Sequence, residues 1–138
     1  MMTNYHQYQQ YQQQQVFTAP ADKLLLMLFD GAIRFCKQAN EAIEGERLEE
    51  AYQALIRAQE IVLELMNSLE RNFEFTEQLY ALYDYLYRSL ITVNMKKDLV
   101  LLNEILVMLI ELRQTWAEAA AQVRGTKKLA VGGGGLEG

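Results

Sequence analysis

The sequence is poor in proline, cysteine and histidine, with one residue of each. The single proline is Pro20 and most glycines follow Arg124, so nothing interrupts long helices between residues 20 and 124. The single cysteine, Cys36, excludes an internal disulfide and a thiolate metal cluster, and it fits a reducing compartment. We therefore expect an all-α protein located in the cytosol.

The scarcity of histidine limits the chemistry that the chain can carry. His6 lies in a Gln-rich N-terminal segment, whereas di-iron and haem bundles place several histidines on core-facing helices. A Ser-His or Cys-His pair cannot be built from the remaining residues, and the isolated Gly31 and Gly45 form no phosphate-binding loop. Carboxylates spaced along one helix, such as Glu104 and Glu111, are predicted to be solvated. We expect no metal, no cofactor and no enzymatic activity.

Positive charge is also scarce. The formal net charge is −5, and the 13 basic residues are spread singly or in pairs, so nucleic acid is not an expected partner. No basic start followed by an apolar run marks a secretory signal. The most apolar segment, residues 99–112, contains two glutamates and is too short to cross a bilayer. We expect no membrane insertion.

What the chain does have is apolar surface at helical spacing. The pattern predicts helices over about 20–44, 46–70, 77–95 and 98–123, with Gly45 as a stop signal and Asp98 as a cap. Four such helices joined by short connections predict one antiparallel up-down four-helix bundle over 18–124. A Gln- and Tyr-rich arm at 1–17 precedes it. A flexible Gly-rich tail at 125–138, whose end resembles an added linker, follows it.

Each expected helix has one face suited to a core. The predicted core residues, in chain order, are Leu25, Leu28, Phe29, Ala32, Phe35, Cys36, Ala39, Ile43, Leu48, Tyr52, Leu55, Ala58, Val62, Leu65, Met66, Leu69, Leu79, Leu82, Tyr83, Leu86, Leu90, Val93, Leu101, Leu102, Ile105, Met108, Leu109, Leu112 and Trp116. Cys36 falls in the middle of its face, which predicts a small buried side chain and not a reactive thiol.

Two of the four helices carry more apolar surface than one buried face requires. The helix over 77–95 has a second stripe made of Tyr80, Tyr87 and Ile91 beside its core stripe. The helix over 98–123 has further apolar residues outside its core arc, namely Leu99, Val100, Leu106, Val107 and Ile110. Because little protein is left to cover these side chains, they predict a surface that binds a partner.

Two polar residues within the first of these helices have open roles. Asp84 either makes a structural hydrogen bond to a tyrosine or a neighbouring helix, or sets the register of a bound peptide. Asn94 either caps the helix or contacts the partner. The candidate partner-binding residues are Tyr80, Tyr83, Asp84, Tyr87, Ile91, Asn94, Leu99, Val100, Leu106, Val107 and Ile110.

Particular motifs are similar to those of a known family. The run 24–39, LLLMLFDGAIRFCKQA, and the run 79–86, LYALYDYL, resemble the flagellin-specific export chaperones of the bacterial flagellar type III secretion system, the FliS family. The resemblance covers about residues 11–120 and includes Asn94, Asp98 and Trp116. It implies a cytoplasmic four-helix bundle that binds the disordered C-terminal segment of flagellin, prevents its premature polymerisation and helps to deliver it to the export gate.

The start of the first helix departs from the family pattern. Family members usually open this helix with T-A-S-P-E, whereas Thr18-Ala19-Pro20-Ala21-Asp22 moves the proline one place earlier and lacks the serine. Family arms also carry tyrosines that pack over part of the client groove. The resemblance therefore implies a groove-capping role for arm residues, of which the candidates are Tyr8, Tyr11 and Val16.

Two other classes of protein remain as alternatives. The surplus apolar stripes could pair with themselves in a weak homodimer, which would make the chain a helical interaction or regulatory protein. A small-molecule enzyme is the least favoured class, because the chain lacks a nucleophile-base pair and a metal site.

Overall fold

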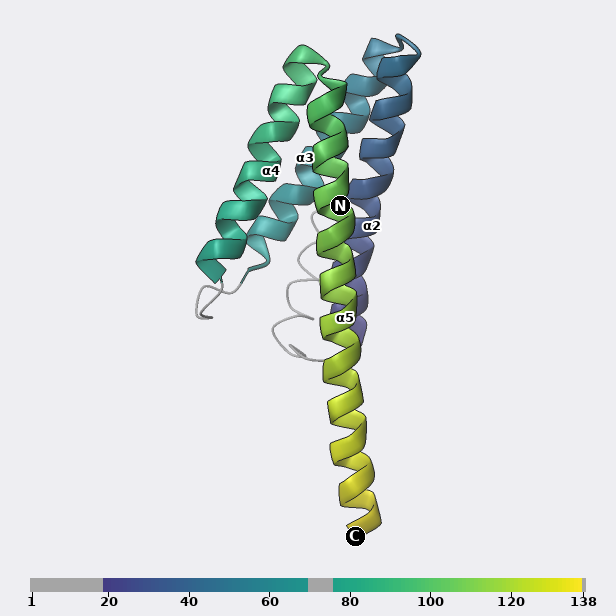
Figure 1. Ribbon diagram of the computed structural model, residues 1–138, viewed down its shortest axis with the longest axis vertical. Helices are drawn as coiled ribbons and strands as arrows, with labels where there is room; N and C mark the ends of the chain where they lie inside the picture. The colour runs from purple at the N-terminus through teal and green to yellow at the C-terminus, as the bar shows by residue number, and fades with distance from the viewer. Residues whose placement is uncertain (1–18, 70–75, 138) are drawn as a thin grey trace, which may run out of the picture.

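The computed structural model describes the backbone of residues 19–69 and 76–137 and the side chains of residues 23–69 and 76–122. Four helices follow one another: α2 (Ala19–Glu44), α3 (Leu48–Asn67), α4 (Thr76–Lys96) and α5 (Leu99–Glu137). They run alternately up and down in one bundle (Figure 1). The predicted all-α up-down bundle is therefore confirmed.

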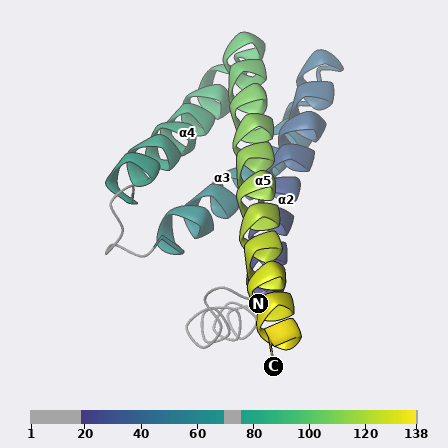
Figure 2. The ribbon, with the colours of Figure 1, turned by 60° about the horizontal axis from the view of Figure 1, so that its bottom comes forward.

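The helices are arranged as a four-membered ring in cross-section. The main contacts join α2 to α3, α3 to α4, α4 to α5 and α5 back to α2, with α4 and α5 packed least closely. These two helices lie together near the turn that joins them, and α4 leans away from α5 toward its own start (Figures 1 and 2). The face between α4 and α5 is consequently the least closed side of the bundle.

The core is built from the apolar positions that recur every three or four residues. Each helix contributes fully buried side chains, the largest of which are Phe29, Cys36, Leu55, Val62, Leu65, Tyr83, Leu86, Leu90, Val93, Leu102, Ile105 and Leu109. Gly31 lets α2 approach α3 closely, since a Cβ atom there would lie 3.1 Å from Cδ1 of Ile61. All twelve residues belong to the core that the sequence predicts.

Residues 45–47 turn the chain from α2 into α3. The N–H of Glu46 donates to the carbonyl of Ile43 at 3.0 Å, and that of Arg47 donates to the carbonyl of Ala42 at 2.8 Å. This pair of bonds is a Schellman motif, in which the residue after the helix cap adopts a left-handed conformation. Here that residue is Glu46, with φ 58°, and not the predicted Gly45.

The chain passes from α4 to α5 through Lys97 and Asp98 alone. Lys97 has φ 53°, and its N–H donates to the carbonyl of Val93 at 2.6 Å, which ends α4. The Asp98 carboxylate accepts a hydrogen bond from the N–H of Leu101 at 3.1 Å, so its predicted capping role is confirmed.

Two polar contacts fix α5 against α2. Asn40 donates to Oδ1 of Asn103 at 3.1 Å, and Arg113 pairs with Asp30, with 2.9 Å between Nε and Oδ1. Asp30 and Asn40 are ten residues apart on α2, and their partners Arg113 and Asn103 are ten residues apart on α5 in the reverse order. Two antiparallel helices in one register require this relation. Because side-chain pairs of this kind would be broken by a shift of one turn, they specify that register.

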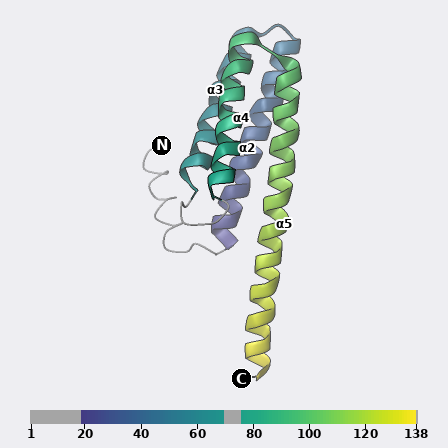
Figure 3. The same ribbon diagram turned by 60° about the vertical axis from the view of Figure 1, so that its left-hand side comes forward.

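Several sequence-based predictions about the helices are wrong. Leu48 and Tyr52 were expected in the core, but they are 54% and 45% exposed, because the buried face in the first turns of α3 is the one that carries Ala51, Ala54 and Leu55. Leu106 was expected outside the core arc, yet it is half-buried and packs against the core. The backbone of α5 continues as helix to Glu137 and projects beyond the other helices (Figure 3). The flexibility expected of residues 125–138 stays a prediction.

Candidate partner-binding site

The second stripe of α4 lies at the surface of the bundle. Tyr80 and Ile91 are 39% and 37% exposed, and Tyr87 is half-buried against the core. Asp84 pairs with Arg88 one turn further along the same helix, with 3.0 Å between Oδ2 and Nε. This ion pair within α4 is not the structural hydrogen bond that the sequence suggested for Asp84. The contact of Asp84 to a bound peptide stays a prediction.

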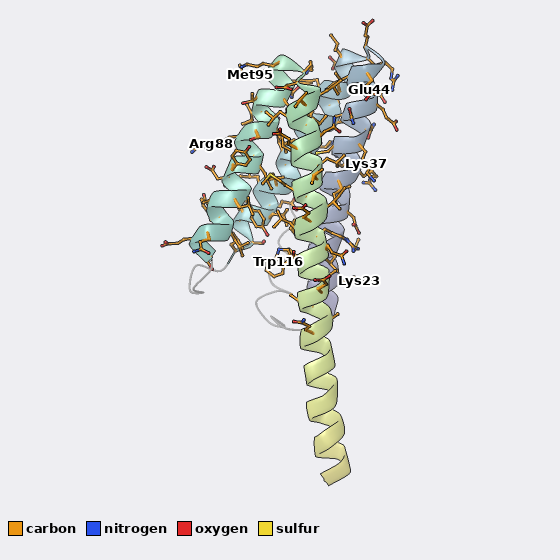
Figure 4. The ribbon with its side chains drawn as sticks, in the orientation of Figure 1. Lys23, Lys37, Glu44, Arg88, Met95 and Trp116 are labelled. Carbon is orange, nitrogen blue, oxygen red and sulfur yellow. The ribbon has the colours of Figure 1, made fainter. Side chains whose placement is uncertain are left out.

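The end of this stripe borders a depression between α3 and α4. It has a volume of about 290 Å³ and is lined by Tyr52, Ile56, Gln59, Ile91, Asn94 and Met95. Its walls are mostly apolar, and the amides of Gln59 and Asn94 supply hydrogen-bonding groups beside them. Met95 lies near the C-terminal end of α4, while Arg88 projects from the outer side of this helix (Figure 4). Such a depression can accept one apolar side chain of a peptide and bond its backbone.

Asn94 helps to close the C-terminal end of α4. The Lys97 ammonium donates to the backbone carbonyl of Asn94 at 2.7 Å and to its side-chain oxygen. The same ammonium lies 5.7 Å from the centroid of the Tyr52 ring, which is a cation-π distance. Lys97 thus links the two helices that border the depression and adds positive charge to its rim.

Tyr83, which the sequence placed both in the core and among the candidate partner-binding residues, lies in the core of the free protein. It is 1% exposed, its ring meets Phe29 edge to face with 6.2 Å between centroids, and its hydroxyl accepts a hydrogen bond from Nε1 of Trp116 at 3.0 Å. Burial raises the pKa of Tyr83 to about 12, with the Trp116 hydrogen bond acting in the opposite direction. Trp116 lies on the side of α5 that faces α4 (Figure 4).

The candidate residues of α5 form a separate surface. Val100, Val107 and Ile110 are 72%, 54% and 44% exposed, and none of them lines the depression between α3 and α4. Leu99 is half-buried, and Leu106 is half-buried against the core in the same way as Tyr87. The structure therefore divides the predicted site between an α3–α4 surface and an α5 surface.

The remaining candidates cannot be placed. Tyr8, Tyr11 and Val16 lie outside the described residues.

Within the part of the chain whose side chains are described, no three His, Cys, Asp or Glu residues are close enough together to hold a metal ion. Among the described helices, none combines the length and the apolar character that crossing a membrane demands.

Some residues of the α3–α4 surface were missed in the sequence. Ile56 and Gln59 lie four and seven residues after Tyr52, a spacing that places all three on one face of α3. This pattern was present in the sequence as a second stripe, but Tyr52 was assigned to the core. Met95, which is 79% exposed, follows Ile91 by one turn and extends the stripe of α4 in the same way.

Comparison with known proteins identifies the family. The family model described as "Flagellar protein FliS" matches residues 2–123. The flagellar secretion chaperone FliS of Bacillus subtilis is 37% identical over 129 residues, which cover 94% of this chain and 95% of that protein. The corresponding chaperone of Campylobacter jejuni is 31% identical over 85% of this chain and 93% of its own length, and that of Escherichia coli is 26% identical over 75% and 79%. The chain belongs to the FliS family of flagellar proteins.

Proposed function

We propose that this protein is a cytoplasmic flagellar secretion chaperone that binds the disordered C-terminal segment of flagellin. It keeps that segment from polymerising too early and assists its delivery to the type III export gate. The name "flagellar secretion chaperone" that relatives carry supports this function. The protein acts by binding, without a chemical step of its own.

One observation carries the proposal: a bundle with a complete core still exposes large apolar side chains on two surfaces. Beyond its buried core, it leaves Tyr52, Ile91, Met95, Val100 and Val107 more than one-third exposed. Each large apolar side chain that becomes buried contributes roughly 1.5 to 3 kcal/mol. Several must be covered together to offset the ordering of a disordered client. A client that wraps around the bundle fits this distribution better than one compact ligand.

The test compares two substitutions at sites of similar exposure. Ile91 lines the α3–α4 depression, whereas Leu63, on α3, is 40% exposed and does not line it. Ile91→Asp should weaken binding of a flagellin C-terminal peptide in isothermal titration calorimetry by about tenfold or more, and Leu63→Asp should leave it nearly unchanged. Equal affinities for the two variants would refute the role of this depression. No binding of the peptide to the unaltered protein would refute the function.

A weak homodimer is the alternative use of the same surfaces. The molar mass from light scattering, measured for the protein alone and with the flagellin peptide, distinguishes a chaperone from a homodimer. For a chaperone we expect the free protein to be a monomer or a weak dimer. The flagellin peptide should dissociate any dimer and form a one-to-one complex. A stable dimer that the peptide leaves intact would favour an interaction or regulatory protein.

A further inference from the structure

The outer face of α5 has the pattern of a second coiled-coil seam. The exposed or half-buried residues of this face are Val100, Val107, Ile110, Gln114, Ala117 and Ala121, which we term the α5 stripe. The position between Val100 and Val107 is taken by Asn103, which bonds to Asn40 of α2 and marks the border of the stripe with that helix. All residues of the α5 stripe except the half-buried Ala117 are exposed. Side chains at these positions form one row along a helix, about 30 Å long here, suited to a second helix.

A row of acidic residues runs beside the α5 stripe. Glu104, Glu111 and Glu118 recur every seven residues, and all three are exposed. The only basic residue among the described side chains of α5 is Arg113, which is paired with Asp30 on the opposite border. The α5 stripe is therefore bordered on one side by three carboxylates that no basic residue in the described part of α5 balances.

We propose that the α5 stripe binds an amphipathic helix whose apolar seam is flanked by Lys or Arg. In a coiled-coil arrangement, residues flanking the seam of one helix face those flanking the seam of the other, so the acidic row selects basic flanking residues. Val100, Val107 and Ile110 supply the apolar anchors. The small side chains of Ala117 and Ala121 allow close approach of the backbone further along. This inference deepens the proposed function, since it assigns a class of ligand to the α5 part of the partner surface.

Charge disfavours the two occupants that this chain itself could supply. A second copy docked through the same stripe would bring one acidic row against another, which is destabilising. Residues 1–18 contain no Lys or Arg and so offer no complement to the acidic row. The side chains of Val100, Val107 and Ile110 are 72%, 54% and 44% exposed, so the described helices leave them accessible to a partner.

The test uses two synthetic helical peptides of equal length, with Leu at the seam positions and either Lys or Glu at the flanking positions. Fluorescence anisotropy at low salt should give affinity for the Lys peptide about tenfold or more above that for the Glu peptide, and added salt should reduce the difference. The triple variant Glu104→Lys, Glu111→Lys, Glu118→Lys should reverse the preference. Val107→Ser should weaken binding of the Lys peptide.

A matched control changes the net charge by the same amount elsewhere. The triple variant Glu41→Lys, Glu44→Lys, Glu60→Lys alters exposed residues of α2 and α3, and it should retain the preference for the Lys peptide. Equal affinities for the two peptides, or a reversal in the control as well, would overturn the proposal. Dimers in sedimentation velocity that are lost in Val107→Ser would also overturn it, because a second copy would then occupy the α5 stripe. Binding of the Lys peptide only after removal of residues 1–18 would do the same, because those residues would then be the occupant. Flagellin binding is measured separately, so failure here leaves the proposed function standing.

Discussion

At the scale of single residues, Cys36 and Tyr83 show how the core accommodates polar atoms. Cys36 is fully buried, and burial raises the pKa of its thiol to about 12, so almost no thiolate exists near neutral pH. Tyr83 is buried too, but its hydroxyl has a partner in Trp116. The two residues show how a core can hold polar atoms either by suppressing ionisation or by completing a hydrogen bond.

The Tyr83–Trp116 bond should contribute measurably to stability. Trp116→Phe leaves the Tyr83 hydroxyl buried without its donor, so we expect a loss of about 1 to 3 kcal/mol in the free energy of unfolding, partly from lost packing. Tyr83→Phe combined with Trp116→Phe should be less destabilising than the sum of the two single changes. Urea denaturation of the four proteins measures the coupling; strict additivity would mean that the bond contributes nothing.

The raised pKa of Tyr83 predicts a loss of stability at high pH. Its folded-state pKa is about 12 against an ordinary value of 10.0, so the unfolded chain releases this proton first as pH rises. The stabilisation from keeping Tyr83 neutral is complete below pH 10 and is lost between pH 10 and 12. Denaturation midpoints at pH 9 and 11 should therefore fall further for the unaltered protein than for Tyr83→Phe. Equal decreases would show that this tyrosine titrates normally.

Cys36 offers a simple check on the core. We expect no reaction with Ellman's reagent in the native protein and full reaction in urea, because the thiol is buried and protonated. Rapid labelling without denaturant would show that α2 leaves the bundle readily.

At the scale of the helices, the two ends that use a left-handed residue are informative. Glu46 and Lys97 have φ values of 58° and 53°, and non-glycine residues pay a conformational cost there. The sequence predicted the α2 stop at Gly45 because glycine is usual at such ends. The structure instead places glycine at the cap and glutamate at the strained position.

The strain predicts a stabilising substitution. Glu46→Gly should raise the free energy of unfolding by about 0.5 to 1 kcal/mol, since glycine adopts this conformation without a Cβ clash. Lys97→Gly should gain less or lose stability, because it removes the ammonium contacts to Asn94 and the Tyr52 ring. Thermal melts of the two variants compare these outcomes, and an equal gain for both would show that the Lys97 contacts are without effect.

Neighbouring positions of α5 test which side chains belong to the core. Leu106 packs against the core and Val107 is 54% exposed. Leu106→Asp should lower stability by about 1 to 3 kcal/mol, while Val107→Asp should change it by less than about 0.5 kcal/mol. Chemical denaturation measures both. Similar midpoints would mean that the assigned faces of α5 are incorrect.

These elements show what a sequence can and cannot predict. Helical periodicity identified the core from Phe29 to Leu109, because burial selects apolar residues at every third or fourth position. It misplaced Tyr52 and Leu106, since the apolar residues of α3 and α5 cover more than one face and periodicity alone does not decide which of them the neighbouring helices bury. Which surfaces adjoin also could not be predicted, because the depression that joins Ile91 to Gln59 depends on the packing of α3 against α4.

At the scale of the whole molecule, the bundle is closed unequally. The α2–α5 side is fixed by Asn40–Asn103 and Arg113–Asp30, whereas α4 and α5 pack least closely. A client that inserts between helices would find the least resistance there, and one that stays on the surface would leave the bundle unchanged.

The arm provides a prediction at this scale. If residues 1–15 cover part of the partner surface in the free protein, their removal should leave the melting temperature nearly unchanged, increase self-association and speed the capture of a flagellin C-terminal peptide. Stopped-flow association of the full-length and shortened chains measures the effect. Equal rates without added self-association would mean that the arm has no capping role.

The position of Trp116 also makes the protein its own optical probe. It is the only tryptophan in the chain, and its indole N–H bridges α5 to a buried tyrosine of α4. The intrinsic fluorescence of Trp116 therefore reports the polarity of the contact between α4 and α5 alone. A client that separates these two helices will shift the emission to longer wavelength, while a client that coats the exterior will leave the spectrum unmoved.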